Sequence, residues 1–258
     1  MIPAFITRRI SERRRQRFLS KIDSSQPGLE IGPCHNGIAR KEAFPSVKIL
    51  DHLDQAGLVA KYSSHAHVDV SKIEPVDFVW SGEPLPDLVG SDRFHWIIAS
   101  HVIEHVPDPI RFIQQCLDLL VPGGVLLLAV PDRRRTFDFL RPSTGTGEIV
   151  DAFVQKSTRP TPGQVAEHFL SVARKGSKTS WPSMRPGPTV RIHSVEEARQ
   201  AFQQASECHY VDVHIWKFSP ESFREVFADV HRLGLLPCVP SVFASALSME
   251  FFAVIQRN

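Results

Sequence analysis

The chain has 258 residues, of which 42% are hydrophobic and 22% are charged, and its 30 Lys and Arg nearly balance its 28 Asp and Glu. This composition is typical of a globular protein and excludes disordered and fibrous chains. A net charge of +2 also argues against a protein that coats nucleic acid, so we expect no nucleic-acid partner.

The four cysteines are spread along the chain without a C-x-x-C pair, which excludes a disulfide framework and a zinc ribbon. This usage indicates a reducing compartment, and we expect a cytoplasmic protein. No apolar run approaches the roughly 20 residues that a membrane span needs. The N-terminal stretch lacks the apolar core and small-residue cleavage site of a secretory signal, so none is expected.

Residues 8–22 predict a helix crowded with arginines, within a basic N-terminal segment that we place at residues 1–24. Two interpretations stay open. The helix could make a weak contact with an anionic partner or lipid surface, or it could be a solvated helix that covers one edge of the domain.

Short apolar segments then alternate with helical patterns. Five strands are predicted, at residues 29–31, 47–50, 76–79, 96–99 and 125–130, and a helix over 109–120 precedes the last of them. Such alternation predicts a parallel sheet with helices on both faces.

The C-terminal part of the chain resumes this pattern after an interruption. A capped helix from Pro220 to Leu233 is followed by two strands, 235–243 and 249–255, which we expect to pair antiparallel at the sheet edge. Residues 132–210 form the interruption: six prolines punctuate them, and helices are predicted near 147–156, 162–175 and 194–206. We interpret them as an insertion in a domain made of 25–131 and 211–258.

The first strand ends at Gly32, and a short loop leads to Gly37. Glycines at such a turn let a ligand approach the backbone closely. The loop fails the dinucleotide fingerprint because Cys34 replaces its second glycine. It fails the phosphate-loop motif because Ile38 and Ala39 stand where Lys and Ser/Thr are needed. The loop therefore suits a ligand without a triphosphate, unless it is an ordinary strand-to-helix turn.

An acidic residue, Asp51, ends the second strand and follows Gly32 by 19 residues. A carboxylate at this place can accept hydrogen bonds from both hydroxyls of a ribose. The glycine loop and the acid together indicate a cofactor that contains a nucleoside.

These motifs, together with Ala99–Pro109, Leu119–Leu126 and Phe218–Phe223, resemble the class I S-adenosylmethionine-dependent methyltransferases. The match is close to a bacterial subgroup found with polysaccharide and glycosyltransferase systems. The resemblance implies an α/β fold, a Rossmann-like doubly wound sheet of seven mostly parallel strands with the last antiparallel. It also implies S-adenosylmethionine as cofactor, a small-molecule or glycan acceptor methylated on oxygen, and a helical lid at 132–210 that selects the acceptor.

The resemblance also assigns cofactor contacts. Glu30 would face the methionine amino group, Asp51 would hold the ribose, and the segments after the third and fourth strands would lie near the adenine. The acidic residue often found after the third strand in this family is replaced here by Ser81. The full set of expected cofactor contacts is Glu30, Gly32, Pro33, Asn36, Gly37, Asp51, His52, Leu53, Trp80, Ser81, Ala99, Ser100 and His101.

Methyl transfer from a sulfonium needs alignment and exclusion of water more than covalent help. A hydroxyl acceptor still gains from a general base, and histidine, whose pKa is generally near 6.5, is the usual choice. The candidate catalytic residues are His101, His105, Asp132 and His214, with His168 as a further candidate. The triplet Arg133–Arg135 could bind a phosphate or carboxylate of the acceptor, or be a solvated turn.

Rival interpretations rest on partial motifs. His101-x-x-Glu104-His105 matches an inverted zinc-protease motif, but prolines at 107 and 109 cut the helix that it needs. His65-x-His67-x-Asp69 lacks the last histidine of a metallohydrolase motif. We therefore expect no metal. Two functional alternatives remain, a Rossmann-type NAD-dependent oxidoreductase and a catalytically silent methyltransferase-like scaffold, and the oligomeric state is not predicted.

Overall fold

The computed structural model describes residues 16, 19–65, 68–181, 187–244 and 248–258. Most of the predicted basic helix over 8–22, and His67, lie outside these residues. The described chain divides into two compact units. The N-terminal unit comprises Glu12–Val102, Ile113–Leu128 and Val254–Asn258, and the C-terminal unit comprises Ile103–Phe112 and Ala129–Ala253.

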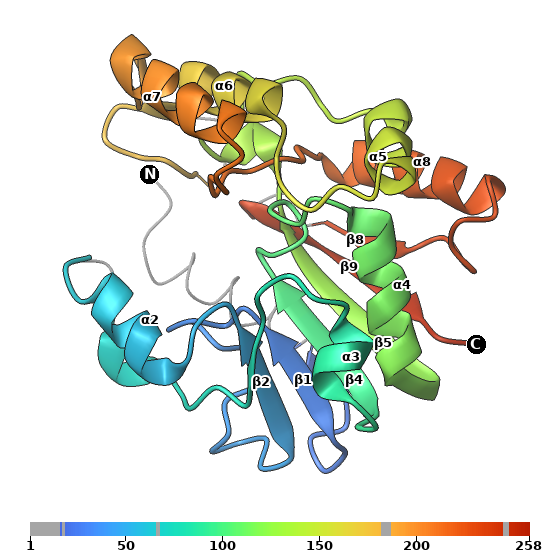
Figure 1. The fold of residues 1–258 in the computed structure, drawn as a ribbon. Helices are drawn as coiled ribbons and strands as arrows, with labels where there is room; N and C mark the ends of the chain where they lie inside the picture. The colour runs from blue at the N-terminus through green and yellow to red at the C-terminus, as the bar shows by residue number, and fades with distance from the viewer. Residues whose placement is uncertain (1–15, 17–18, 66–67, 182–186, 245–247) are drawn as a thin grey trace. The chain divides into compact units, whose positions relative to one another are not determined.

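Seven strands form one sheet in the order β3-β2-β1-β4-β5-β9-β8. The strands are β1 (Gly28–Ile31), β2 (Val47–Asp51), β3 (Phe78–Val79), β4 (Phe94–Ser100), β5 (Leu120–Pro131), β8 (Ser241–Phe243) and β9 (Glu250–Gln256). Strands β3, β2, β1 and β4 are parallel neighbours, and Figure 1 shows β2, β1 and β4 in succession. The sheet is mixed and mostly parallel, with an antiparallel edge, which confirms the predicted fold class.

The antiparallel part of the sheet involves β5 and β9. The amide of Asp132 donates to the carbonyl of Met249, and the amide of Arg257 donates to the carbonyl of Gly124. Residue numbers on the two strands therefore change in opposite directions along the ladder, as antiparallel pairing requires.

Continuous apolar runs explain the central strands. The side chains of Ile97 and Ile98 in β4 and of Leu126–Leu128 in β5 are fully buried, as expected for strands covered on both faces. Trp96 packs against Gly28, where an added Cβ would lie 2.1 Å from the indole ring. Glycine at the start of β1 therefore makes room for the largest side chain of β4.

The helices are α2 (Gln55–Tyr62), α3 (Leu85–Val89), α4 (Pro109–Leu119), α5 (Thr146–Val154), α6 (Pro162–Ser171), α7 (Val195–Ser206) and α8 (Pro220–Arg232). Short 3-10 turns occur at Val70–Lys72 and Arg133–Arg135, and β6 (Ala173–Lys175) pairs antiparallel with β7 (Thr189–Arg191). In the described part of the chain, no helix is long and apolar enough to cross a membrane.

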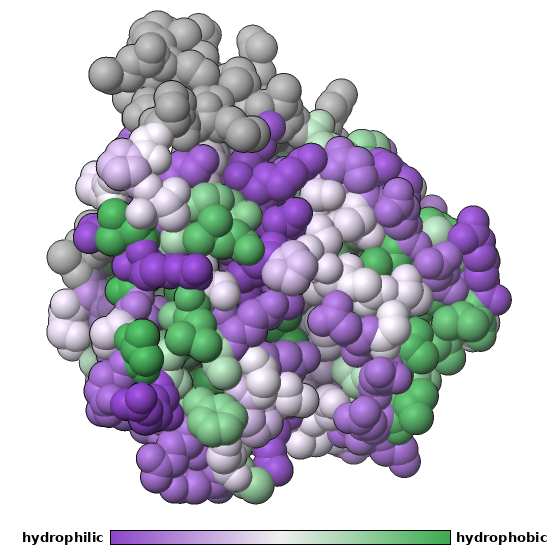
Figure 2. All heavy atoms as spheres, turned by 90° about the horizontal axis from the view of Figure 1, so that it is seen from above, coloured by the Kyte–Doolittle hydropathy of each residue, from purple (hydrophilic) through white to green (hydrophobic). Residues whose placement is uncertain are grey.

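The C-terminal unit contains two helix pairs, α6 with α7 and α5 with α8 (Figure 1). Capping boxes start three of these helices, at Thr161, Ser194 and Ser219. Some large apolar side chains of α7 stay exposed, among them Val195 and Phe202. Figure 2 shows apolar side chains interspersed among hydrophilic ones on one face of the molecule.

The boundaries predicted for the insertion, at residues 132 and 210, stay predictions. Its role as a lid over the acceptor also stays a prediction.

Candidate functional site

All of the expected cofactor contacts lie in the N-terminal unit, at or just after the carboxyl ends of β1, β2, β3 and β4. Because these four strands are parallel neighbours, their carboxyl ends meet at one edge of the sheet. Ligands of open α/β sheets bind at this edge. The topology therefore brings the predicted contacts to one place, and their individual roles stay predictions.

The loop after β1 makes a tight turn with left-handed backbone. Gly32 has a φ of +66° and Cys34 a φ of +44°, and the amide of Asn36 donates to the carbonyl of Pro33 at 2.9 Å. A Cβ on Gly32 would lie 2.9 Å from Cγ2 of Val102. Glycine at position 32 is therefore required both by the backbone conformation and by the lack of space.

The Glu30 carboxylate holds the far end of this loop. The side chain is 1% exposed and accepts hydrogen bonds from the amides of Ile38, at 2.6 Å, and Ala39, at 2.9 Å. The sequence did not indicate that Glu30 would hold the loop in this way. Each carboxylate oxygen has a second lone pair, so the expected contact with a ligand amino group is compatible with it.

Asp51 ends β2 and is 4% exposed. Its Oδ2 accepts from the amide of Cys34 at 3.2 Å, and its Oδ1 accepts from the amide of His52 at 2.8 Å. The Nδ1 atom of His52 lies 2.7 Å from the same Oδ1. These contacts fix the carboxylate beside the loop, and Oδ2 keeps a lone pair that can accept from a ribose hydroxyl.

An acidic side chain also stands after β3, two positions beyond the expected one. The amide of Ser81 donates to the carboxylate of Glu83 at 2.8 Å, and the indole of Trp80 donates to the carbonyl of Glu83 at 2.7 Å. The sequence carried a usable signal here, because Glu83 follows the strand closely. Sequence reasoning tested only position 81 for an acid.

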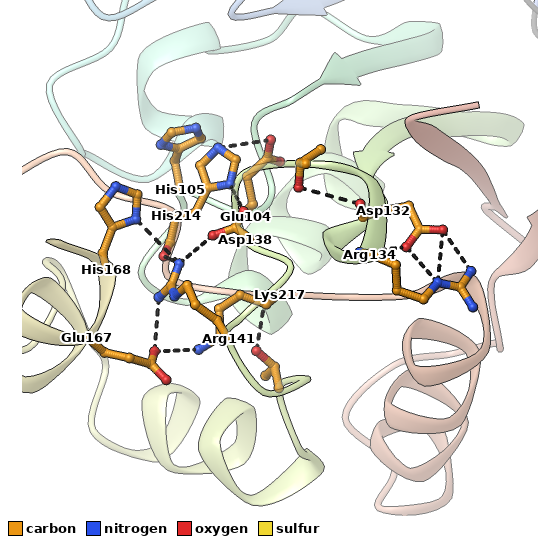
Figure 3. Close-up of polar contacts among 12 residues, drawn as sticks. Glu104, His105, Asp132, Arg134, Asp138, Arg141, Glu167, His168, His214 and Lys217 are labelled. Carbon is orange, nitrogen blue, oxygen red and sulfur yellow. Dashed lines mark hydrogen bonds and ion pairs between the residues drawn. The ribbon is translucent and has the colours of Figure 1, made fainter. Parts of the chain in front are cut away.

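A cluster of two histidines and a glutamate lies in the C-terminal unit (Figure 3). One possible ligand atom from each of Glu104, His105 and His214 lies within 4.8 Å of the others, and the two imidazole rings meet edge to face at 4.7 Å. The amides of Ile215 and Trp216 donate to the carbonyl of Glu104. This backbone contact fixes His214 beside the segment that follows β4.

A carboxylate orients each of these two imidazoles. Nδ1 of His214 lies 2.6 Å from Oδ2 of Asp138, and Nδ1 of His105 lies 2.7 Å from Oδ1 of Asp212. An ionised carboxylate only accepts hydrogen bonds, so Nδ1 carries the proton in both rings. When such a ring is neutral, its lone pair lies on Nε2. The Nε2 atom of His214 lies 4.0 Å from Oε1 of Glu104.

Asp138 is 1% exposed and remains ionised in this setting. Its burial opposes ionisation, but the hydrogen bond from His214 and the charges of His214 and Arg141 outweigh burial and hold the pKa of Asp138 below its ordinary value. The Arg141 guanidinium donates to Oδ1 of Asp138 at 2.8 Å and to the carbonyl of His214, also at 2.8 Å. Sequence reasoning did not identify Asp138 or Arg141.

Arg141 also connects this cluster to α6. Its guanidinium donates to Glu167 at 3.0 Å and lies 3.3 Å from Nδ1 of His168, while Lys217 donates to the same Glu167 oxygen at 3.0 Å. Burial, followed by the positive charge of Arg141, lowers the pKa of His168 to about 3. His168 is therefore neutral near pH 7 and poorly suited to take up a proton.

The predicted catalytic residues are divided between the two units. His105 and His214 come together in the C-terminal unit, whereas His101, with a left-handed φ of +55°, belongs to the N-terminal unit. Asp132 forms an ion pair with Arg134 at 2.7 Å. Its Oδ1 also accepts from the amide of Arg134, so the carboxylate has a structural role in the turn that follows it.

The arginine triplet after β5 has partners within the chain. Arg133 donates to the carbonyl of Arg141 and to Ser143, and Arg135 donates to the carbonyl of Ser248. These contacts favour a structural role for the triplet over recognition of an acceptor anion.

Comparison with known proteins gives a family match over most of the chain. Residues 4–230 match a family model described as "Methyltransferase domain". The "Ubiquinone biosynthesis O-methyltransferase" of Xanthomonas campestris pv. campestris is 25% identical over 114 residues, which cover 37% of this chain and 48% of that protein. The protein of the same name from Glaesserella parasuis serovar 5 is 30% identical over 111 residues, which cover 41% and 45%. The chain thus spans about half the length of the curated relatives it matches.

A solved structure also resembles the chain over nearly its whole length. It is an O-methyltransferase family protein from Burkholderia thailandensis, with 11% identity and a TM-score of 0.45, and the match covers 97% of this chain and 57% of that one.

Proposed function

This chain belongs to the methyltransferase-domain family, and from that membership we propose that it transfers the methyl group of S-adenosylmethionine to a hydroxyl of a small molecule or glycan. The observation that carries the proposal is the pairing of the Gly32 turn with Asp51 at neighbouring carboxyl ends of parallel strands. A hydrogen bond from the amide of Cys34 to Asp51 joins the two features.

The residues at this edge fit the cofactor by their chemistry. A ribose diol needs an acceptor, and Asp51 offers a fixed carboxylate. A methionine ammonium needs negative charge, and Glu30 offers it beside a turn in which Gly32 leaves the backbone uncovered. When bound, S-adenosylmethionine supplies a methyl group on a sulfonium, whose carbon–sulfur bond breaks with the electron pair left on sulfur.

The acceptor hydroxyl loses a proton as its oxygen forms the new bond to carbon. We assign that proton to Nε2 of His214, from which it passes to solvent. Asp138 keeps the opposite nitrogen protonated and holds the ring in place, which is how a carboxylate orients a general-base histidine. His105 is a second candidate, because Asp212 orients it in the same way.

The acceptor class rests on the names of relatives and on a resemblance. The curated relatives are named as O-methyltransferases, which favours a hydroxyl acceptor. The resemblance to the polysaccharide-associated subgroup favours a sugar. We assign acceptor selection to the insertion at 132–210, which contains α5, α6 and α7.

An acceptor screen tests this proposal. The purified chain is incubated with S-adenosylmethionine and separate pools of nucleotide-sugars, glycans and phenols. Release of S-adenosylhomocysteine and a mass gain of one methylene in an acceptor are expected in at least one pool. A parallel incubation contains NAD in place of S-adenosylmethionine, and reduction of NAD by a pool without methyl transfer in the first incubation would instead support the oxidoreductase alternative.

A further inference from the structure

We propose that Glu104, His105 and His214 form a binding site for a divalent transition-metal cation. The three side chains come from two segments of the C-terminal unit, and their ligand atoms lie within 4.8 Å of one another. No metal was expected from the sequence, in which His101, Glu104 and His105 would have to share one helix. In the structure, the second imidazole of the cluster comes instead from His214, which precedes α8.

The geometry needs little change to hold a cation. Metal–nitrogen bonds of about 2.1 Å place neighbouring ligand atoms about 3–3.5 Å apart, so the cluster must contract by about 1 Å. Small side-chain rotations can achieve this. The backbone is already in place, because the carbonyl of Glu104 accepts from the amides of Ile215 and Trp216.

The surroundings of the two histidines are those of metal ligands. A metal-bound imidazole commonly donates its other nitrogen to a carboxylate, which fixes the tautomer and raises the basicity of the ligand nitrogen. Here Asp138 binds Nδ1 of His214, and Asp212 binds Nδ1 of His105. The same arrangement therefore occurs twice in one cluster.

Burial and charge also suit a cation. Glu104 is fully buried and His214 is 9% exposed, and a bound cation would compensate the cost of burying the carboxylate. The side chain of His105 is 31% exposed, so the site is open to solvent on that side. Three protein ligands leave coordination positions for water or substrate, as in catalytic rather than structural sites.

The ligand set selects the class of cation. Imidazole suits zinc, copper, iron and nickel, whereas calcium, magnesium and manganese prefer sites made of oxygen ligands. If the proposed function holds, a cation bound to His214 takes over the task assigned to its Nε2, because a cation lowers the pKa of a bound hydroxyl and so activates it without that base. That use rests on the proposed function, whereas the binding itself does not.

Cobalt titration tests the site without cofactor or acceptor. The full chain, without a histidine tag and freed of metal by a chelator, is titrated with Co²⁺ and followed by visible absorption and calorimetry. We expect one equivalent to bind with micromolar affinity and to produce ligand-field bands. His105→Gln should abolish both signals, and His209→Gln, which changes a histidine with a 69% exposed side chain in the same unit, should leave them unchanged.

Asp212→Asn provides a variant that is expected to fold, since its side chain is 64% exposed. Because Asp212 is a positioning residue, the Asp212→Asn variant should bind Co²⁺ on the order of 10-fold more weakly and show shifted ligand-field bands. Failure of the wild-type chain to bind a stoichiometric cation would overturn the proposal, and so would equal affinity in His105→Gln. Neither result bears on S-adenosylmethionine binding, which calorimetry on the chelator-treated chain reports separately.

Discussion

Asp138 and His214 form a buried pair in which Oδ2 of the carboxylate lies 2.6 Å from Nδ1 of the imidazole. The pair joins two regions that are distant in sequence, and Arg141 completes it by binding Oδ1 of Asp138. The carboxylate fixes the tautomer of His214, and that tautomer makes Nε2 available either to a proton or to a cation. The chemistry proposed for the C-terminal unit therefore depends on a residue that would itself touch neither acceptor nor cofactor.

Replacing Asp138 with Asn should remove this control. The amide can donate to Nδ1 and favour the opposite tautomer, so we expect turnover to fall by at least on the order of 100-fold. The affinity for S-adenosylmethionine should stay the same. Release of S-adenosylhomocysteine measures turnover, and ¹⁵N NMR of the imidazole reports the tautomer. Because Asp138 also binds Arg141, the melting temperature checks folding, and His214→Gln serves as a second variant. Normal turnover in both variants would contradict the assigned base.

Gly32→Ala and Gly234→Ala together separate backbone strain from lack of space. The two glycines have φ values of +66° and +73°, and an added Cβ would lie 2.9 Å from Val102 at position 32 but would meet nothing within 4 Å at position 234. We expect about 1 kcal/mol of destabilisation from the backbone at either position, and about 1–2 kcal/mol more at Gly32. Urea unfolding measures both. Equal losses would show that Val102 moves aside without cost.

Glu30→Gln should loosen the loop that follows β1. The carboxylate accepts two backbone amides, and an amide side chain can accept from one while presenting a donor to the other. Loss of a hydrogen bond to a buried charge costs about 1.5–3 kcal/mol. We expect a lower melting temperature and faster hydrogen exchange at the amides of Ile38 and Ala39. Unchanged exchange at these two amides would show that the loop is held by other contacts.

The pKa of His168 predicts a loss of stability in mild acid. The folded chain keeps His168 neutral down to about pH 3, whereas the unfolded chain protonates it below its ordinary pKa of 6.5. The unfolded state therefore binds more protons between these values, and stability falls as the pH falls. At pH 5 this amounts to about 2 kcal/mol.

His168→Gln isolates this contribution from that of the neighbouring carboxylates. Between pH 7.5 and pH 5 the melting temperature of the variant should fall less than that of the wild type, and the difference should be several degrees. An equal loss in the two proteins would show that His168 is protonated in the folded state at pH 5.

The sequence predicted the core of the sheet because its strands are continuous apolar runs. The runs at 47–50 and 125–130 lie within β2 and β5, and the helix predicted over 109–120 is α4, Pro109–Leu119. Local patterns failed where elements are short. Helices α2 and α3 were not predicted, and β3 is only Phe78–Val79. The strand predicted over 235–243 begins only at Ser241, because the prolines at 237 and 240 lack the amide that a ladder requires.

The site residues were also only partly predictable from the sequence. Gly32 and Asp51 could be found, since each ends an apolar strand and they lie 19 residues apart. The roles of Asp138 and Asp212 could not be predicted, and neither could the contact between Glu104 and His214. These contacts join segments that are far apart in the sequence, and no local pattern relates such segments. Glu83 could have been identified from the sequence, because it lies only two positions beyond Ser81, where the acid was expected.

Calorimetric titration with S-adenosylmethionine, S-adenosylhomocysteine and NAD tests the central claim most directly. We predict micromolar binding of the first two ligands and no heat from NAD. Asp51→Ala should weaken binding by on the order of 10- to 100-fold, because the charged acceptor of the ribose hydroxyls is lost, while the exposed control Asp92→Asn should bind normally. Binding of NAD alone, or wild-type affinity in Asp51→Ala, would contradict the account.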